Sequence, residues 1–172
     1  MKWKGKLIEY LIKELGNDEN WSSITEKLLH NSPIGIHLAI FNEPFLSLLL
    51  SGKKKIESRF SINRVPPFMK VAKGDVILIK EAGGPIIGLF VAGEVKYFQN
   101  LKPSILSDIE SKYGNLICTS YDDKFWENRK TAKFATLINV EMIKDLRPFK
   151  DGKSDKTGWS VIRTGIANSL FI

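Results

Sequence analysis

The chain has 172 residues with a formal net charge of +7, and 43% of its residues are hydrophobic. This length and composition favour one globular domain with a substantial core and an appendage over two full domains. The single cysteine, Cys118, excludes an internal disulfide framework and a cysteine-rich zinc site, and no apolar run approaches the roughly 20 residues of a membrane-spanning helix. The N-terminal residues also lack the apolar core of a signal peptide, so we expect a cytoplasmic protein without a membrane partner.

The first thirty residues predict two helices. An apolar stripe at helical spacing predicts an amphipathic helix over residues 3–15; its members are Leu7, Ile8, Leu11, Ile12 and Leu15. A second helix is predicted over residues 22–29, where Ser23 followed by Glu26 fits a capping box. We expect these helices to form an N-terminal cap, residues 1–32, on the domain that follows. A partner-docking or dimerising arm is the alternative.

A strand and a short helix come next. After a natural break at residues 31–33, the apolar run 36–40 predicts the first strand. Pro44 then opens a helix over residues 45–50, which Gly52 ends. This helix leads the chain directly into a densely charged segment.

The charged segment holds most of the excess positive charge. Residues 51–70 have a net charge of +5, whereas the thirty N-terminal residues are neutral overall; the cations are Lys53, Lys54, Lys55, Arg59, Arg64 and Lys70. In a strand over residues 55–59, alternation would place Lys55, Glu57 and Arg59 on one face. Two cations beside a carboxylate suit an anionic or hydrogen-bonding ligand such as a nucleotide. A solvated surface loop is the alternative explanation.

The rest of the chain predicts more strands than helices. The expected elements are a proline-fixed loop at 61–68, strands at 75–81 and 86–98, a helix at 104–113, a helical turn at 123–129, and strands at 133–146 and 159–163. Gly83 and Gly84 predict a tight turn between the first and second of these strands, and Gly88 and Gly93 predict bulges or a bend. Strands with helices inserted between them indicate an α+β fold built around a single mixed barrel.

Three motifs of the chain occur together in one known family. Gly52, Lys54, Glu57 and Arg59 fit the Gly-x-Lys-x-x-Glu-x-Arg pattern of ASCH domains, residues 73–80 fit the family's Gly-Asp and apolar strand, and residues 158–162 are similar to its closing strand. Residues 34–163 therefore resemble an ASCH domain of the PUA-like superfamily. The resemblance implies a small mixed PUA-like β-barrel with inserted helices, here residues 33–172, behind the two-helix cap.

Most catalytic signatures are missing from the sequence. His30 and His37 have no clustered partners, which argues against a metal site, and we expect His37 to be a structural residue. The chain has no Gly-x-Ser-x-Gly nucleophile elbow and no glycine-rich phosphate loop. We therefore expect neither a metal nor another cofactor.

One enzymatic function follows from the resemblance. Some proteins that resemble this barrel are amidohydrolases that remove acyl groups from modified cytidine with a Lys, Thr and Glu set. Their lysine falls at Lys54, but Glu57 occupies the threonine position, and no counterpart of the distal glutamate is evident. The nucleophilic hydroxyl is thus missing, although Lys54 and Glu57 could activate water as acid and base. Hydrolysis of an acylated nucleoside or a related small amide is one alternative function.

A binding function uses more of the chain. The candidate residues supply charge, hydrogen bonds and rings for stacking on an unpaired base: Lys54, Lys55, Glu57, Arg59, Arg64, Lys80, Phe68, Trp126 and Trp159. Glu57 could accept from a base amino group or hold Arg59 in place, and Trp159 could belong to the core. We expect a domain that binds RNA or a modified nucleotide in a basic cleft, with hydrolysis and a protein-interaction module as the alternatives.

Overall fold

A computed structural model of the chain describes residues 2–29, 34–150, 152 and 157–165. The helices and strands are α1 (Lys2–Leu15), α2 (Ser22–Leu29), β1 (Ile36–Phe41), α3 (Phe45–Leu50), β2 (Ile56–Ser61), β3 (Val76–Glu81), β4 (Ile86–Gln99), α4 (Pro103–Ile117), β5 (Phe134–Phe149) and β6 (Trp159–Arg163). Three short 3-10 helices are η1 (Glu19–Trp21), η2 (Thr119–Tyr121) and η3 (Glu127–Arg129). The predicted helices and strands are thus confirmed, while His30 and the predicted break at 31–33 lie outside the described residues. Within those residues, no helix is both long and apolar enough to cross a membrane.

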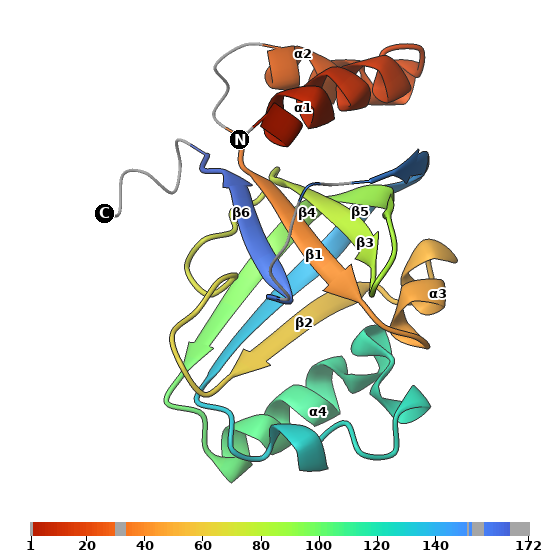
Figure 1. Cartoon of the computed structure of the whole chain (residues 1–172). Coiled ribbons are helices and arrows are strands. Elements are labelled where there is room, and N and C mark those ends of the chain that lie inside the picture. The colour runs from red at the N-terminus through yellow and green to blue at the C-terminus, as the bar shows by residue number, and fades with distance from the viewer. Residues whose placement is uncertain (1, 30–33, 151, 153–156, 166–172) are drawn as a thin grey trace.

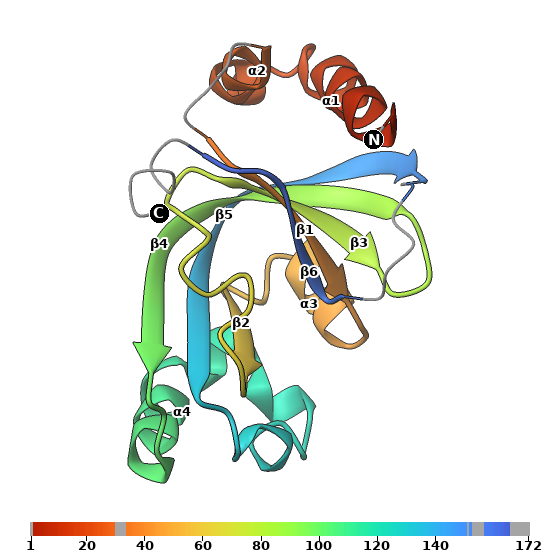
Figure 2. The same ribbon diagram turned by 60° about the vertical axis from the view of Figure 1, so that its left-hand side comes forward.

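The six strands form one mixed sheet in the order β2-β5-β4-β3-β1-β6. β1 and β3 are parallel, and the other neighbouring pairs are antiparallel. The long strands β4 and β5 bend, so the sheet curls into a half-barrel (Figures 1 and 2). The register of β4 against β5 shifts between Ala92 and Val95, where a Cβ on Gly93 would lie 2.5 Å from Glu141 Oε1. This shift is a bulge at a predicted position, which helps the sheet to bend, and the predicted α+β barrel-like fold is confirmed.

Helices α1 and α2 lie over the outer face of the curled sheet (Figure 2). Their apolar side chains and those of the sheet form one buried cluster, which includes Leu7, Leu11, Leu15, Ile24, Leu28, Leu38, Leu78 and Leu89. The predicted capping box is wrong: α2 follows directly from η1, so Ser23 lies within the helical run, and Asp18 caps η1 by accepting from the Asn20 amide. A division of the chain at residue 32 stays a prediction.

Strand β3 is buried on both of its faces. Val76 and Leu78 belong to the cluster under α1 and α2, whereas Ile77 and Ile79 point into the interior of the half-barrel. This interior cluster also contains Phe90, and α4 covers a third cluster at the far end of the molecule (Figure 1). A strand between two apolar layers has an unbroken apolar sequence, as this one does.

Candidate functional site

Arg59 joins the two edges of the half-barrel. β2 stands at one end of the strand order and β6, next to β1, at the other. From β2, Arg59 Nη2 donates to the Ile40 carbonyl of β1 at 2.9 Å, and Nη1 donates to the Gly158 carbonyl just before β6 at 3.2 Å. We call this junction the seam. A side chain rather than a strand pair holds it together.

A buried carboxylate fixes the arginine at the seam. Glu57 Oε1 accepts from Arg59 Nε at 2.6 Å, and Glu57 Oε2 lies 3.5 Å from Lys54 Nζ. Lys54 and Glu57 are only 2% and 3% exposed, and Lys54 also donates to the Ile117 carbonyl at 2.9 Å. Burial lowers the pKa of the Lys54 ammonium, and the nearby Glu57 carboxylate opposes that change. The carboxylate thus serves two buried or half-buried cations at once.

The sequence predicted Lys55 on the same face as Glu57 and Arg59, whereas the structure places Lys54 beside the carboxylate. β2 begins only at Ile56, and a turn through Gly52, with φ at 75°, precedes it. Lys55 is exposed, and its amide donates to the Leu116 carbonyl. Lys55 precedes the strand and is exposed, whereas Glu57 is buried, so the extrapolation of strand alternation to Lys55 was wrong.

A first cavity of about 130 Å³, the seam cavity, lies on one side of Arg59. Its lining comprises Ile40, Phe41, Asn42, Phe45, Lys54, Glu57, Ser58, Arg59, Phe125 and Arg129. Arg129, which the sequence analysis missed, stacks with its Cζ 3.6 Å from the Phe125 ring centre and donates to the Phe125 carbonyl at 2.8 Å. Burial lowers the pKa of Arg129, yet an arginine keeps its charge at neutral pH. Three cations and one carboxylate therefore converge on this cavity.

A second cavity of about 220 Å³, the loop cavity, lies on the other side of Arg59. Its lining comprises Arg59, Phe60, Ser61, Val65, Pro66, Pro67, Phe68, Thr136, Gly158 and Trp159. Phe68 and Trp159, both proposed from the sequence as stacking residues, are buried, and their rings form part of the wall. Phe68 packs against Tyr97 and Phe134, so its ring is fixed in place.

Three other predicted site residues lie outside both linings. Arg64 is exposed at the loop, with its Cζ 5.2 Å from the Phe68 ring centre. The Lys80 ammonium donates to the Gly84 carbonyl in the turn between β3 and β4. Trp126 packs against Phe125 and, with residues of α4, lines a separate cavity. The structure thus brings Lys54, Glu57 and Arg59 together, with Phe68 and Trp159 nearby.

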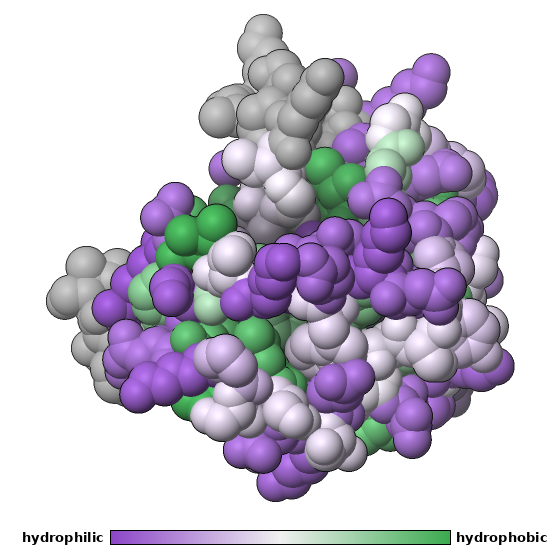
Figure 3. All heavy atoms as spheres, turned by 90° about the horizontal axis from the view of Figure 1, so that it is seen from below, coloured by the Kyte–Doolittle hydropathy of each residue, from purple (hydrophilic) through white to green (hydrophobic). Residues whose placement is uncertain are grey.

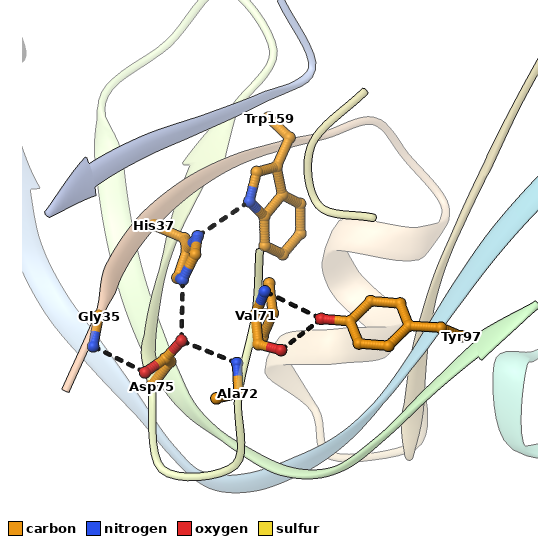
Figure 4. A network of polar contacts seen from close by, with 7 residues as sticks. All are labelled: Gly35, His37, Val71, Ala72, Asp75, Tyr97 and Trp159. Carbon is orange, nitrogen blue, oxygen red and sulfur yellow. Dashed lines mark hydrogen bonds and ion pairs between the residues drawn. The ribbon is translucent and has the colours of Figure 1, made fainter. Parts of the chain in front are cut away.

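His37 belongs to a structural network inside the half-barrel (Figure 4). The Trp159 indole donates to His37 Nδ1 at 3.2 Å, and His37 Nε2 lies 3.1 Å from Asp75 Oδ2. An indole nitrogen can only donate, so Nδ1 is unprotonated and Nε2 carries the proton that Asp75 accepts. Asp75 also accepts from the amides of Gly35 and Ala72 at 2.7 and 2.9 Å. The described residues contain no group of three or more His, Cys, Asp or Glu side chains arranged to hold a metal ion.

The surface that carries α4 mixes hydrophilic and hydrophobic residues. Seen from below Figure 1, hydrophobic residues reach the surface between hydrophilic ones across much of this face (Figure 3). Hydrophilic residues separate the hydrophobic ones in this view (Figure 3).

A curled mixed sheet with helices inserted between its strands also occurs in solved structures, several of which are of one ASCH protein. The crystal structure of ASCH from Zymomonas mobilis matches with a TM-score of 0.59 at 16% identity, over 79% of this chain and 93% of that one. Tyrosine-to-phenylalanine and serine-to-alanine mutants of that protein match with TM-scores of 0.58 at 16% identity, over 79% of this chain and 96% and 94% of theirs. Neither a scan against protein-family models nor a search of curated proteins finds a match. The chain therefore has an ASCH-like fold, as the charged motif predicted.

Proposed function

We propose that the chain binds RNA or a modified nucleotide at the seam. The observation that carries this proposal is the convergence of Lys54, Arg59 and Arg129 with Glu57 on one small cavity. The group has an excess of positive charge, and a cavity with that balance favours a ligand that is anionic or rich in hydrogen-bond acceptors. Phe45 and Phe125 supply aromatic surface in the same lining. Charge and aromatic rings together are what proteins use to hold unpaired bases and their phosphates.

The surroundings of the seam favour a polyanion over a small neutral ligand. Lys53, Lys55, Arg64 and Lys70 are exposed side chains of the same charged segment, on either side of β2. Exposed cations attract phosphates over several ångströms and increase the rate of association, while the buried cations hold a bound group in place. We expect the affinity for single-stranded RNA to fall steeply as salt rises.

The test is a fluorescence titration of single-stranded RNA with Lys54→Met and its matched control, Lys55→Met. Each variant removes one ammonium group, and the two positions are adjacent in the chain, but only Lys54 lines the seam cavity. We expect Lys54→Met to weaken binding by about tenfold or more. We expect Lys55→Met to reduce the slope of log affinity against log salt concentration by about 1, the share of one phosphate contact. Equal effects of the two variants, with both proteins folded, would move the binding site away from the seam.

Hydrolysis of an acylated nucleoside is the second candidate. Two observations favour it: the lowered pKa of Lys54, and the presence of Ser58 in the lining of the same cavity. However, Glu57 already accepts from Arg59, and it cannot replace the threonine of the amidohydrolases as a nucleophile. We expect no appreciable release of acetate from N4-acetylcytidine. Turnover by the unmodified protein that Lys54→Met abolishes would promote this candidate above binding.

A protein-interaction module is the third candidate, but only the polar faces of α1 and α2 are open to a partner. The apolar stripes of α1 and α2 are buried against the sheet, so they are not free to dock a partner. Ion pairs join Glu14 to Arg147 and Asp18 to Lys144. These pairs also fix the helical layer to β5. A partner for these helices would have to bind their polar faces.

A further inference from the structure

The seam cavity and the loop cavity share Arg59 as their common wall. Their volumes are about 130 and 220 Å³. Pockets that enclose a whole small-molecule ligand usually measure from about 300 Å³ upward, so neither cavity reaches that size alone. The two cavities taken together do reach it. A ligand of ordinary size at this site would therefore have to occupy both cavities and extend across Arg59.

The guanidinium at this wall has donors left for a ligand. An arginine carries five N–H donors, and Arg59 uses three of them on Glu57, Ile40 and Gly158. The other two, one on each terminal nitrogen, have no hydrogen-bond partner among the described residues. The side chain is 23% exposed, and Phe41 and Trp159 flank it with ring centres 5.0 and 5.4 Å from Cζ. A fixed guanidinium with an unused donor on each terminal nitrogen can bind phosphate oxygens.

The loop cavity has the lining of a second base or sugar site. Phe60, Phe68 and Trp159 supply aromatic surface, and Ser61 and Thr136 supply hydroxyl groups. Thr136 stands opposite Arg59 in the β2–β5 pair, so its position relative to the guanidinium is set by the sheet. Aromatic surface with a few hydroxyls suits a base, which every nucleotide presents whatever its sequence.

We infer that the ligand is a phosphodiester-linked strand segment rather than a free nucleoside. One base occupies the seam cavity, the next nucleotide occupies the loop cavity, and the phosphate between them binds the two free donors of Arg59. This inference rests on the proposed function, because it assigns a nucleotide to the seam cavity. It adds the length of the recognised unit and the position of its phosphate.

The experiment compares three sets of ligands by isothermal titration: nucleoside 5′-monophosphates, the homodinucleotides ApA, CpC, GpG and UpU, and the same dinucleotides with an uncharged methylphosphonate linkage. We expect at least one dinucleotide to bind about tenfold or more tightly than its mononucleotide, and the methylphosphonate form to lose most of that gain. A dinucleotide that binds no better than its mononucleotide would overturn the inference and leave the proposed function standing. Absence of binding by any of these ligands and by longer single-stranded RNA would instead overturn RNA binding at the seam, on which the inference rests.

A pair of loop variants provides the matched control. Val65 lines the loop cavity and is 47% exposed, whereas Ile62 is 60% exposed in the same loop and lies outside both linings. Both positions tolerate a charge because neither side chain is buried. We expect Val65→Glu to weaken dinucleotide binding without changing mononucleotide binding, and Ile62→Glu to change neither. Identical dinucleotide affinities of the two variants would refute a second site in the loop cavity.

Discussion

Glu57→Gln should lower the free energy of unfolding, because Glu57 is the negative partner of Lys54 and Arg59 at the seam. Glutamine keeps the shape of the side chain and an acceptor oxygen for Arg59, but it removes the charge. Lys54, which is almost wholly buried, then faces Arg59 without a counter-ion. Loss of one partner from a buried ion pair costs about 3–5 kcal/mol, and the partial exposure of Arg59 screens its share, so we expect about 2–4 kcal/mol.

Urea denaturation followed by tryptophan fluorescence measures this loss. Glu94→Gln is the matched control, because Glu94 pairs with Lys96 but its side chain is 62% exposed. We expect the control to change stability by less than about 0.5 kcal/mol. If Glu57→Gln were as stable as the control and yet failed to bind RNA, the structural role derived from these contacts would be refuted, and the carboxylate would be a ligand-binding group.

Three further predictions concern titration and the interior network. Burial lowers the pKa of Lys54 below its usual 10.5. As pH rises toward 10.5, the folded chain therefore binds fewer protons than the unfolded chain, and the free energy of unfolding rises. Lys54→Met should remove this rise in urea denaturation between neutral and alkaline pH, and parallel curves for the two proteins would contradict it. Burial raises the pKa of Tyr97 from 10.0 to about 12. As pH rises through this range, the tyrosine of the unfolded chain loses its proton before that of the folded chain, so the free energy of unfolding falls. Tyr97→Phe should flatten the fall in melting temperature across that range, and an unchanged slope would count against it. Asp75→Asn should cost about 2–4 kcal/mol, because an amide cannot accept all three hydrogen bonds that Asp75 receives, and a cost below about 0.5 kcal/mol in urea would refute this account.

Local patterns were sufficient to predict the elements of the fold. The stripe from Leu7 to Leu15 predicted α1, and the unbroken apolar run after Asp75 predicted β3, because helix and strand periodicity depend on neighbours along the chain. The same reasoning failed where the local context changed. It grouped Lys55 with Glu57 and Arg59 on one strand face, but β2 begins only at Ile56, and Lys55 is exposed where Glu57 is buried.

The sequence by itself determined the α+β class and the charged motif, since both are written in the spacing of neighbouring residues. Only the tertiary structure brought Arg129 and Phe45 to the seam cavity, and only it showed that Arg59 joins the edges of the sheet. Gly158 is separated from Arg59 by almost a hundred residues, and their contact depends on how far β4 and β5 bend. That curvature results from bulges, side-chain packing and the helices on both sides of the sheet acting together, so no single segment of the sequence specifies it.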